Sequence, residues 1–130
     1  MVICYEVIYP ELVREQARRA DFLLTISNDT WFGESIGPVQ HMEMARMRAL
    51  ENGRWLLRGT NNGVTAIVDH RGRVRHQLPQ YREGVLRGSY RLMTGHTPYS
   101  QFGDSPLLIL AVLTAVVFIW HRIRKTTVED

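Results

Sequence analysis

The 130-residue sequence contains a single cysteine and a single lysine, and both scarcities limit what the chain can do. The lone cysteine, Cys4, excludes an internal disulfide, and a lone cysteine is most often a small buried hydrophobe. The sole lysine is Lys125, so arginine supplies nearly all of the sixteen basic residues behind the net charge of +3. These arginines are scattered along the sequence, which is typical of a solvated surface and argues against nucleic-acid binding.

Metal and phosphate motifs are also missing. The sequence has no His-Glu-x-x-His pattern, no paired cysteines and no glycine-rich phosphate loop, so neither a metal nor another cofactor is expected. Cys4 could form a papain-like pair with His41, His70, His76 or His96. None of these histidines has a distinctive spacing, and a surface or capping role suits each of them better.

The N-terminal region lacks the basic cap and apolar run of a signal peptide. The sequence opens directly on Val2-Ile3-Cys4-Tyr5, which has the character of a buried strand. Domains seldom begin so abruptly, so we expect the start of a larger protein to be missing.

Short apolar runs alternate with amphipathic stretches as far as residue 92. The pattern predicts helices over 10–20 and 38–53 and strands over 2–5, 22–27, 55–60, 64–68, 74–78 and 85–90. Asn61-Asn62-Gly63 and Arg71-Gly72 are hairpin signals between neighbouring strands. This order is α/β but is not a repeating βαβ unit, so we expect a mixed sheet rather than a barrel.

The second predicted helix carries an apolar stripe at helical spacing, formed by Val39, Met42, Ala45 and Ala49. We expect this stripe, including its methionine, to face the core rather than to bind a ligand.

Residues 107–120 form an apolar run without any charge. As a helix the run would be about 21 Å long, shorter than the roughly 30 Å hydrocarbon core of a bilayer, which favours a core helix. However, it is apolar on every face, and Trp120 and the basic residues Arg122, Arg124 and Lys125 follow it, as at the cytoplasmic end of a membrane span.

We therefore predict a transmembrane helix over 106–120. A linker rich in glycine, proline, serine and threonine precedes it at 93–105, and a cytoplasmic tail follows at 121–130. This topology would place residues 1–100 outside the cytoplasm.

Cys4-Tyr5-Glu6 stand where the first predicted strand gives way to a helix. A thiol at that point would be held rigidly and close to backbone N–H groups, which are the two features that nucleophilic catalysis needs. The Glu6 carboxylate is within reach of the same pocket if the extended geometry persists. From the residues alone, Cys4 is a candidate nucleophile and nothing more.

Several segments carry a family resemblance. Ile3-Cys4-Tyr5-Glu6-Val7-Ile8-Tyr9-Pro10-Glu11 resembles the nucleophile segment of the nitrilase, or carbon–nitrogen hydrolase, superfamily. Five later segments narrow the resemblance, within this superfamily, to the apolipoprotein N-acyltransferase family. They are Ser27-Asn28-Asp29-Thr30-Trp31-Phe32-Gly33, Gly37-Pro38-x-Gln40-His41, Ala45 to Glu51, Thr60-Asn61-Asn62-Gly63 and Thr97-Pro98-Tyr99 before the last helix.

The resemblance implies a four-layer α-β-β-α sandwich, of which residues 1–92 hold roughly the second half as a partial catalytic domain. It also implies a ping-pong reaction at the bacterial inner membrane, on the periplasmic side. A cysteine thiolate takes an acyl chain from a phospholipid as a thioester. It then passes the chain to the α-amine of a diacylglyceryl-cysteine on an apolipoprotein.

By the same resemblance, Cys4 is the nucleophile and the backbone N–H of Tyr5 donates to the oxyanion. Glu6 and Trp31 match positions in the active site or acyl-donor site. Simpler structural roles are open to two of them. Trp31 could attach its loop to the core, and Glu6 could be a buried, paired carboxylate.

The sequence departs from the family in one large respect. Members use a Glu–Lys–Cys triad whose glutamate and lysine lie upstream, whereas three residues precede Cys4 and the only lysine is Lys125. We expect this chain alone to be inactive and poorly folded, with an unpaired sheet edge and one exposed apolar face. The alternatives are a membrane-tethered nitrilase-like amidase and a non-catalytic relic.

Overall fold

One mixed five-stranded sheet forms the centre of the fold, in the order β1-β2-β3-β4-β5. The strands are β1 (Val2–Ile3), β2 (Phe22–Asn28), β3 (Trp55–Asn61), β4 (Thr65–Val68) and β5 (Val74–Leu78). The first three run parallel, and the last two add antiparallel hairpins. The computed structural model describes residues 1–128 and their side chains as far as residue 124. The expected mixed sheet is confirmed.

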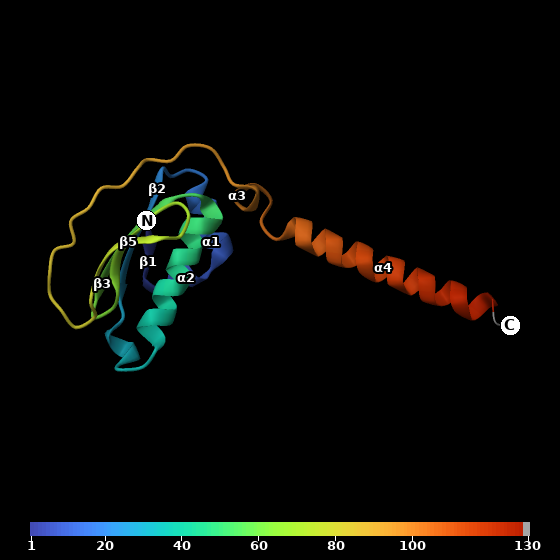
Figure 1. The fold of residues 1–130 in the computed structure, drawn as a ribbon, viewed down its shortest axis with the longest axis horizontal. Helices are drawn as coiled ribbons and strands as arrows, with labels where there is room; N and C mark the ends of the chain where they lie inside the picture. Colours follow the sequence, from blue (N-terminus) through green and yellow to red (C-terminus); the bar gives the residue numbers. More distant parts are fainter. Residues whose placement is uncertain (129–130) are drawn as a thin grey trace.

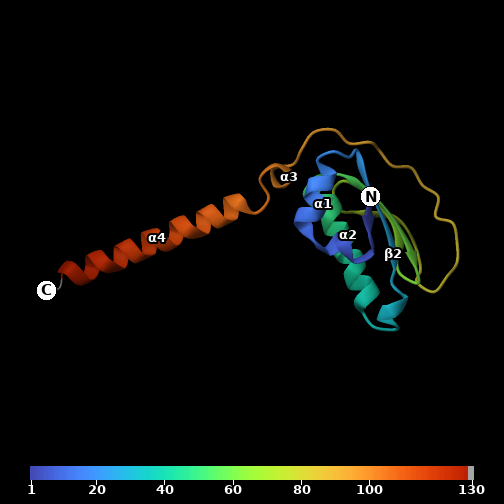
Figure 2. The same cartoon turned by 180° about the vertical axis from the view of Figure 1, so that it is seen from behind.

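Two α-helices cover one face of this sheet, α1 (Pro10–Ala17) and α2 (Gly37–Asn52) (Figure 1, Figure 2). A proline in the first turn starts each helix, where its missing N–H costs no hydrogen bond. Gly53 ends α2 in the left-handed conformation, with φ of 61°, which glycine adopts at little cost.

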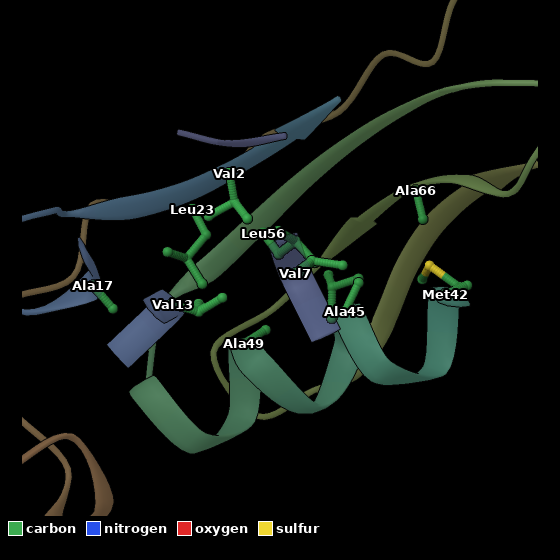
Figure 3. Packing of buried hydrophobic residues seen from close by; sticks show 11 residues of the cluster. Val2, Val7, Val13, Ala17, Leu23, Met42, Ala45, Ala49, Leu56 and Ala66 are labelled. Carbon is green, nitrogen blue, oxygen red and sulfur yellow. The ribbon is translucent and has the colours of Figure 1, made fainter. Parts of the chain in front are cut away.

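The hydrophobic core lies between the sheet and these helices (Figure 3). Ala45 and Ala49 are one turn apart on α2, and their small side chains point toward the strands. Val39, which we expected in the same stripe, is exposed, and His41 is buried instead. The main members of the core are Val2, Val7, Val13, Ala17, Leu23, Met42, Ala45, Ala49, Leu56, Ala66 and Val68.

The first strand is shorter than predicted. We expected it to cover 2–5, but β1 ends at Ile3, and the 3-10 helix η1 (Cys4–Ile8) begins at once. The cause is the backbone of Cys4, whose φ of 51° cannot continue a strand. The first helix likewise stops at Ala17 rather than at residue 20.

The strand predicted over 85–90 is wrong. The segment 79–97 instead runs in an arc around the outside of the sheet, with Val85 82% exposed (Figure 1). Near its end, the Met93 N–H donates to the carbonyl oxygen of Asp21. An apolar stretch becomes a strand only where a neighbouring backbone pairs with it, and this stretch leaves the edge of β5.

The sheet face opposite the helices is partly open. The Tyr90 ring packs on Phe22, with ring centroids 4.9 Å apart, so the arc covers part of this face. Near β1 it is uncovered, since the register neighbours Ile3 and Ile26 are each 54% exposed. The exposed apolar face that we expected is present there.

The C-terminal part begins with a short helix, α3 (Pro98–Phe102), and ends with a long one, α4 (Ser105–Val128). α4 projects away from the sheet, and its side chains as far as residue 124 are exposed (Figure 1, Figure 2). Its segment Ser105–Arg124 is 20 residues long and apolar enough to cross a membrane. That length corresponds to about 30 Å, the thickness of a hydrocarbon core.

Candidate active site

Cys4 is the first residue of η1 and forms the sharp turn at the end of β1. Its positive φ is uncommon outside glycine, and a strand-to-helix turn of this kind presents a nucleophilic side chain at the end of a sheet. Glu6 supports the turn, because its Oε2 accepts a hydrogen bond from the Ile3 N–H at 2.8 Å. Glu6 is exposed, so the interpretation of Glu6 as a buried, paired carboxylate is wrong.

Aromatic rings gather beside this turn. Tyr5 makes edge contacts with Trp31 and Tyr9, at centroid distances of 6.1 and 6.4 Å, and Trp31 stacks on Phe32 at 3.9 Å. Tyr5, Tyr9 and Trp31 are all exposed, Trp31 to 64%. Trp31 therefore does not attach its loop to the core, and it adds to an apolar surface next to the cysteine.

The ring of Phe32 also accounts for the glycine of the Gly37-Pro38 motif. A Cβ at residue 37 would lie 2.7 Å from Cγ of Phe32, which is too close for two carbon atoms. Glycine thus lets the loop bearing Trp31 fold back over the start of α2.

A buried polar cluster lies directly behind Cys4; it consists of Ser27, Asp29, His41 and Arg58 and is called the Asp29 cluster below. Asp29 Oδ1 accepts from Ser27 Oγ at 2.5 Å and lies 2.9 Å from His41 Nδ1. Asp29 Oδ2 accepts from Arg58 Nη2 at 2.9 Å. Ser27 Oγ is in turn 3.6 Å from Cys4 Sγ, which connects the cluster to the thiol.

The electrostatics of the cluster follow from its burial and its ion pair. Burial by itself would raise the pKa of Asp29, but hydrogen bonds from His41 and Ser27 and the charge of Arg58 hold that pKa below 3.8. Burial lowers the pKa of Arg58, and Asp29 opposes that effect. Arginine remains charged at neutral pH, so the cluster is a buried ion pair with two further partners.

Asp29 also explains the Asn61-Asn62-Gly63 motif. The Asp29 N–H donates to the Asn61 carbonyl oxygen at 3.0 Å, which brings the hairpin loop onto the carboxylate. A Cβ at Gly63 would lie 2.9 Å from Cγ of Asp29. The loop can therefore close over Asp29 only with glycine at this position.

This cluster was not predicted from the sequence. His41 was expected at the surface or as a cap, but it is 2% exposed and faces Asp29. The overlooked signal was in β3, where Arg58 stands two residues after the buried Leu56, so both side chains point to the same face of the strand, into the core. A buried guanidinium requires a carboxylate partner, and Asp29 stands at the end of the neighbouring parallel strand.

Cys4, Tyr5, Glu6 and Trp31 thus lie on one side of the molecule, and the Asp29 cluster lies under them. No group of three His, Cys, Asp or Glu side chains within the described part of the chain is placed to hold a metal ion.

Comparison with known proteins identifies related sequences. Residues 1–94 match the family described as carbon-nitrogen hydrolase. Among curated proteins named apolipoprotein N-acyltransferase, one from Azotobacter vinelandii is 59% identical over 123 residues, covering 95% of this chain and 23% of that protein. One from Pseudomonas putida is 55% identical over 125 residues, covering 95% and 25%.

A third such protein, from Pseudomonas aeruginosa, is 54% identical over 118 residues and covers 91% and 22%. The chain thus spans about a quarter of the length of these relatives. A solved structure of Saccharomyces cerevisiae Nit3, a member of branch 10 of the nitrilase superfamily, matches with a TM-score of 0.48 and 24% identity over 62% of this chain and 33% of that one.

Proposed function

Because the chain belongs to the carbon–nitrogen hydrolase family, we propose that it is the nucleophile-bearing part of an apolipoprotein N-acyltransferase. The observation that carries this proposal is the position of Cys4, in a sharp strand-to-helix turn beside an exposed aromatic surface. The names of the relatives, at 54–59% identity over nearly the whole chain, support the acyltransferase over other family activities.

The proposed reaction has two acyl transfers. The Cys4 thiolate attacks an ester carbonyl of a phospholipid, and the lysophospholipid alkoxide leaves and takes up a proton. The α-amine of a diacylglyceryl-cysteine on an apolipoprotein then attacks the thioester, loses a proton and releases the thiolate. A thioester suits both steps, because it forms from an ester and is a good acyl donor to an amine.

Residues around Cys4 would serve these steps in different ways. The backbone N–H of Tyr5 would donate to the oxyanion that develops on each carbonyl. Glu6 keeps the turn closed through Ile3, and Trp31 offers an apolar contact to the acyl donor.

The long apolar helix α4 fits a reaction on lipids. If its segment Ser105–Arg124 spans the membrane, it holds the catalytic part beside both lipid substrates. By the positive-inside rule, Arg122 and Arg124 at its far end support an orientation with that end in the cytoplasm. Residues 1–100 would then lie at the periplasmic face of a bacterial inner membrane.

The proposed activity also needs groups that residues 1–124, whose side chains the structure describes, do not bring to Cys4. The family triad includes a glutamate and a lysine, but the only lysine, Lys125, stands near the end of α4. We therefore expect no acyl transfer by residues 1–130 alone.

The test is to detect an acyl chain on Cys4. Membranes from cells expressing the natural gene product that contains this chain are supplied with a phospholipid bearing an alkyne-tagged acyl chain. The tag should appear on the Cys4 peptide, should be removed by neutral hydroxylamine and should be absent in Cys4→Ser. Residues 1–130 alone should remain unlabelled.

Two results would contradict the proposal. A wild-type gene product without label on Cys4 would exclude the thioester. Release of the tagged chain as free acid, unaffected by an added diacylglyceryl peptide, would indicate a hydrolase instead.

A further inference from the structure

Ser27 stands between the candidate nucleophile and a buried carboxylate. Its Oγ lies 3.6 Å from Cys4 Sγ and 2.5 Å from Asp29 Oδ1. Ser27 is buried at the end of β2, so its hydroxyl has little access to water. A hydroxyl has one proton and rotates to suit its acceptors, so Ser27 can donate to only one of these two neighbours at a time.

The Asp29 carboxylate has other hydrogen-bond partners besides Ser27. Arg58 Nη2 donates to Oδ2 at 2.9 Å, and His41 Nδ1 lies 2.9 Å from Oδ1. Arg58 Nη2 also lies 3.1 Å from His41 Nδ1, so His41 either donates to Asp29 or accepts from Arg58, depending on its tautomer. The bond from Arg58 to Asp29 is present in either case, because a guanidinium is always a donor. If Ser27 turned away, Asp29 would therefore keep its ion pair.

We propose that Ser27 is a positioning residue for Cys4, held by Asp29 and turning to donate its hydroxyl proton to the sulfur when Cys4 becomes a thiolate. While Cys4 is a thiol, the hydroxyl donates to Asp29, which is much the nearer acceptor. Once the sulfur is negative, it becomes a strong acceptor that competes with a carboxylate already satisfied by Arg58. The proposal rests on the proposed function, in which that thiolate accepts the acyl chain.

Other charged or titratable groups lie near Cys4 on the elements packed against it. Arg58 from β3 attracts an ionised Cys4, whereas Asp29 repels it. His41 approaches from α2, and Glu6 from η1 points to the Ile3 N–H. We expect these groups to keep their positions when Ser27 is changed, because Asp29 retains its ion pair with Arg58, so they form a constant background for a test of Ser27 alone.

Arg58 provides positive charge behind Cys4 that would stabilise a negative sulfur. Its Nε and Nη1 are buried and have no hydrogen-bond partner within residues 1–128. Only Nη2 is thus engaged, with Asp29 Oδ2 at 2.9 Å and close to His41 Nδ1 at 3.1 Å, and the remaining donors leave net positive potential near the thiol.

The test measures the reactivity of Cys4 toward a small neutral alkylating agent, iodoacetamide, because only a thiolate reacts at an appreciable rate. The natural gene product that contains this chain is used in membranes, and the Cys4 peptide is quantified by mass spectrometry over a range of pH. In Ser27→Ala, we expect alkylation near neutral pH to slow about tenfold and the pH profile to move about one unit upward.

Two variants separate this role from a structural one. Ser27→Thr keeps the hydroxyl and should retain the natural pH profile. Ser89→Ala removes an exposed hydroxyl on the outer arc and should change nothing. The midpoint of thermal unfolding, measured on the same samples, shows which changes follow from lost stability.

Two outcomes would overturn the proposal. One is an unchanged pH profile in Ser27→Ala, whatever happens to its thermal midpoint. The other is a shift in Ser27→Thr as large as that in Ser27→Ala. Alkylation requires neither phospholipid nor apolipoprotein, so it succeeds or fails independently of the acyl-transfer test.

Discussion

At the scale of single residues, one buried carboxylate connects motifs that are far apart in the sequence. Asp29 bonds Ser27 two residues away, Arg58 from β3 and His41 from α2, and Gly63 closes the hairpin loop over it. These contacts hold the carboxyl ends of the parallel strands β2 and β3 close to the first turns of α2. Cys4 depends on that arrangement, because its turn rests on the same end of the sheet.

The close approach of Gly63 to Asp29 leads to a first prediction. Gly63→Ala would push a methyl group against the Asp29 carboxylate and displace it from Arg58. Overpacking of a buried site costs about 1–3 kcal/mol, so we expect the free energy of unfolding to fall by about 2 kcal/mol. Urea titration followed by circular dichroism measures this change.

Gly59→Ala is the matched control for this prediction. A Cβ at Gly59 meets nothing within 4 Å, and the residue lies in the neighbouring part of β3. Its stability should match that of the natural chain within about 0.5 kcal/mol. Equal losses in both variants would show that the contact with Asp29 is not the cause.

At the scale of elements, hydrophobic periodicity predicted the elements that pack on the core and failed for the stretch 85–90. β2, β3 and α2 were predicted within a few residues, because each buries one face against the core. The stretch 85–90 has equally strand-like residues but no neighbouring backbone to pair with. Pairing depends on where distant segments lie, and local sequence does not contain that information.

The hairpin between β4 and β5 depends on Asp69. Its Oδ1 accepts from the backbone N–H groups of Arg71 and Arg73, and its Oδ2 pairs with Arg75. Burial would raise the pKa of Asp69, but these bonds together hold that pKa below 3.8. Because the pKa is depressed, the carboxylate stabilises the fold at pH values above its ordinary, unfolded-state pKa. This stabilisation is lost as the pH falls through the lower pKa of the folded state.

We therefore expect the thermal midpoint of the natural chain to fall more steeply than that of Asp69→Asn as the pH drops from about 5 to about 2.5. The asparagine keeps one acceptor but has no charge to lose. Differential scanning calorimetry over this range checks the difference in slope. Parallel slopes would mean that Asp69 contributes little to acid sensitivity.

Thr97 joins the sheet domain to the C-terminal helices. Its Oγ1 accepts from the Ser100 N–H at 3.0 Å as the N-cap of α3, and it donates to the Glu51 carbonyl oxygen at the end of α2. One hydroxyl thus caps α3 and ties it to α2. This double role accounts physically for the threonine of the Thr97-Pro98-Tyr99 motif.

Thr97→Ala should lower the free energy of unfolding by about 1–2 kcal/mol, which is the usual loss for an N-cap. Amide hydrogen exchange at α3 should quicken more than exchange in β2 or β3, because the lost bonds hold α3 locally. Thr97→Ser retains the hydroxyl and should behave like the natural chain. If exchange instead quickened equally throughout the sheet, the local role would be refuted.

At the scale of the whole molecule, the sequence led to a candidate nucleophile but not to the buried side chains behind it. Cys4 is a candidate because a thiol at the end of a strand is recognisable locally and because its neighbours match a known family. The Asp29 cluster was missed because its members come from two strands, a loop and a helix. Only the fold shows that Arg58 and His41 share one carboxylate.

The open face of the sheet sets the behaviour of the chain as a whole. Ile3 and Ile26 are register neighbours at the edge of this face and are more than half exposed. Two such faces can bury apolar area against each other, so we expect self-association that increases with protein concentration. Ile26→Thr should weaken it, because threonine keeps the strand preference of isoleucine and removes apolar surface.

Light scattering of the chain in detergent micelles, which cover α4, would measure this association. Ile36→Thr is the control, since Ile36 is also exposed but precedes α2 away from the open face. We expect the average mass to grow more slowly with concentration for Ile26→Thr and to be unchanged for Ile36→Thr. If both variants associated like the natural chain, the contact would involve another surface, and α4 would be the next segment to test.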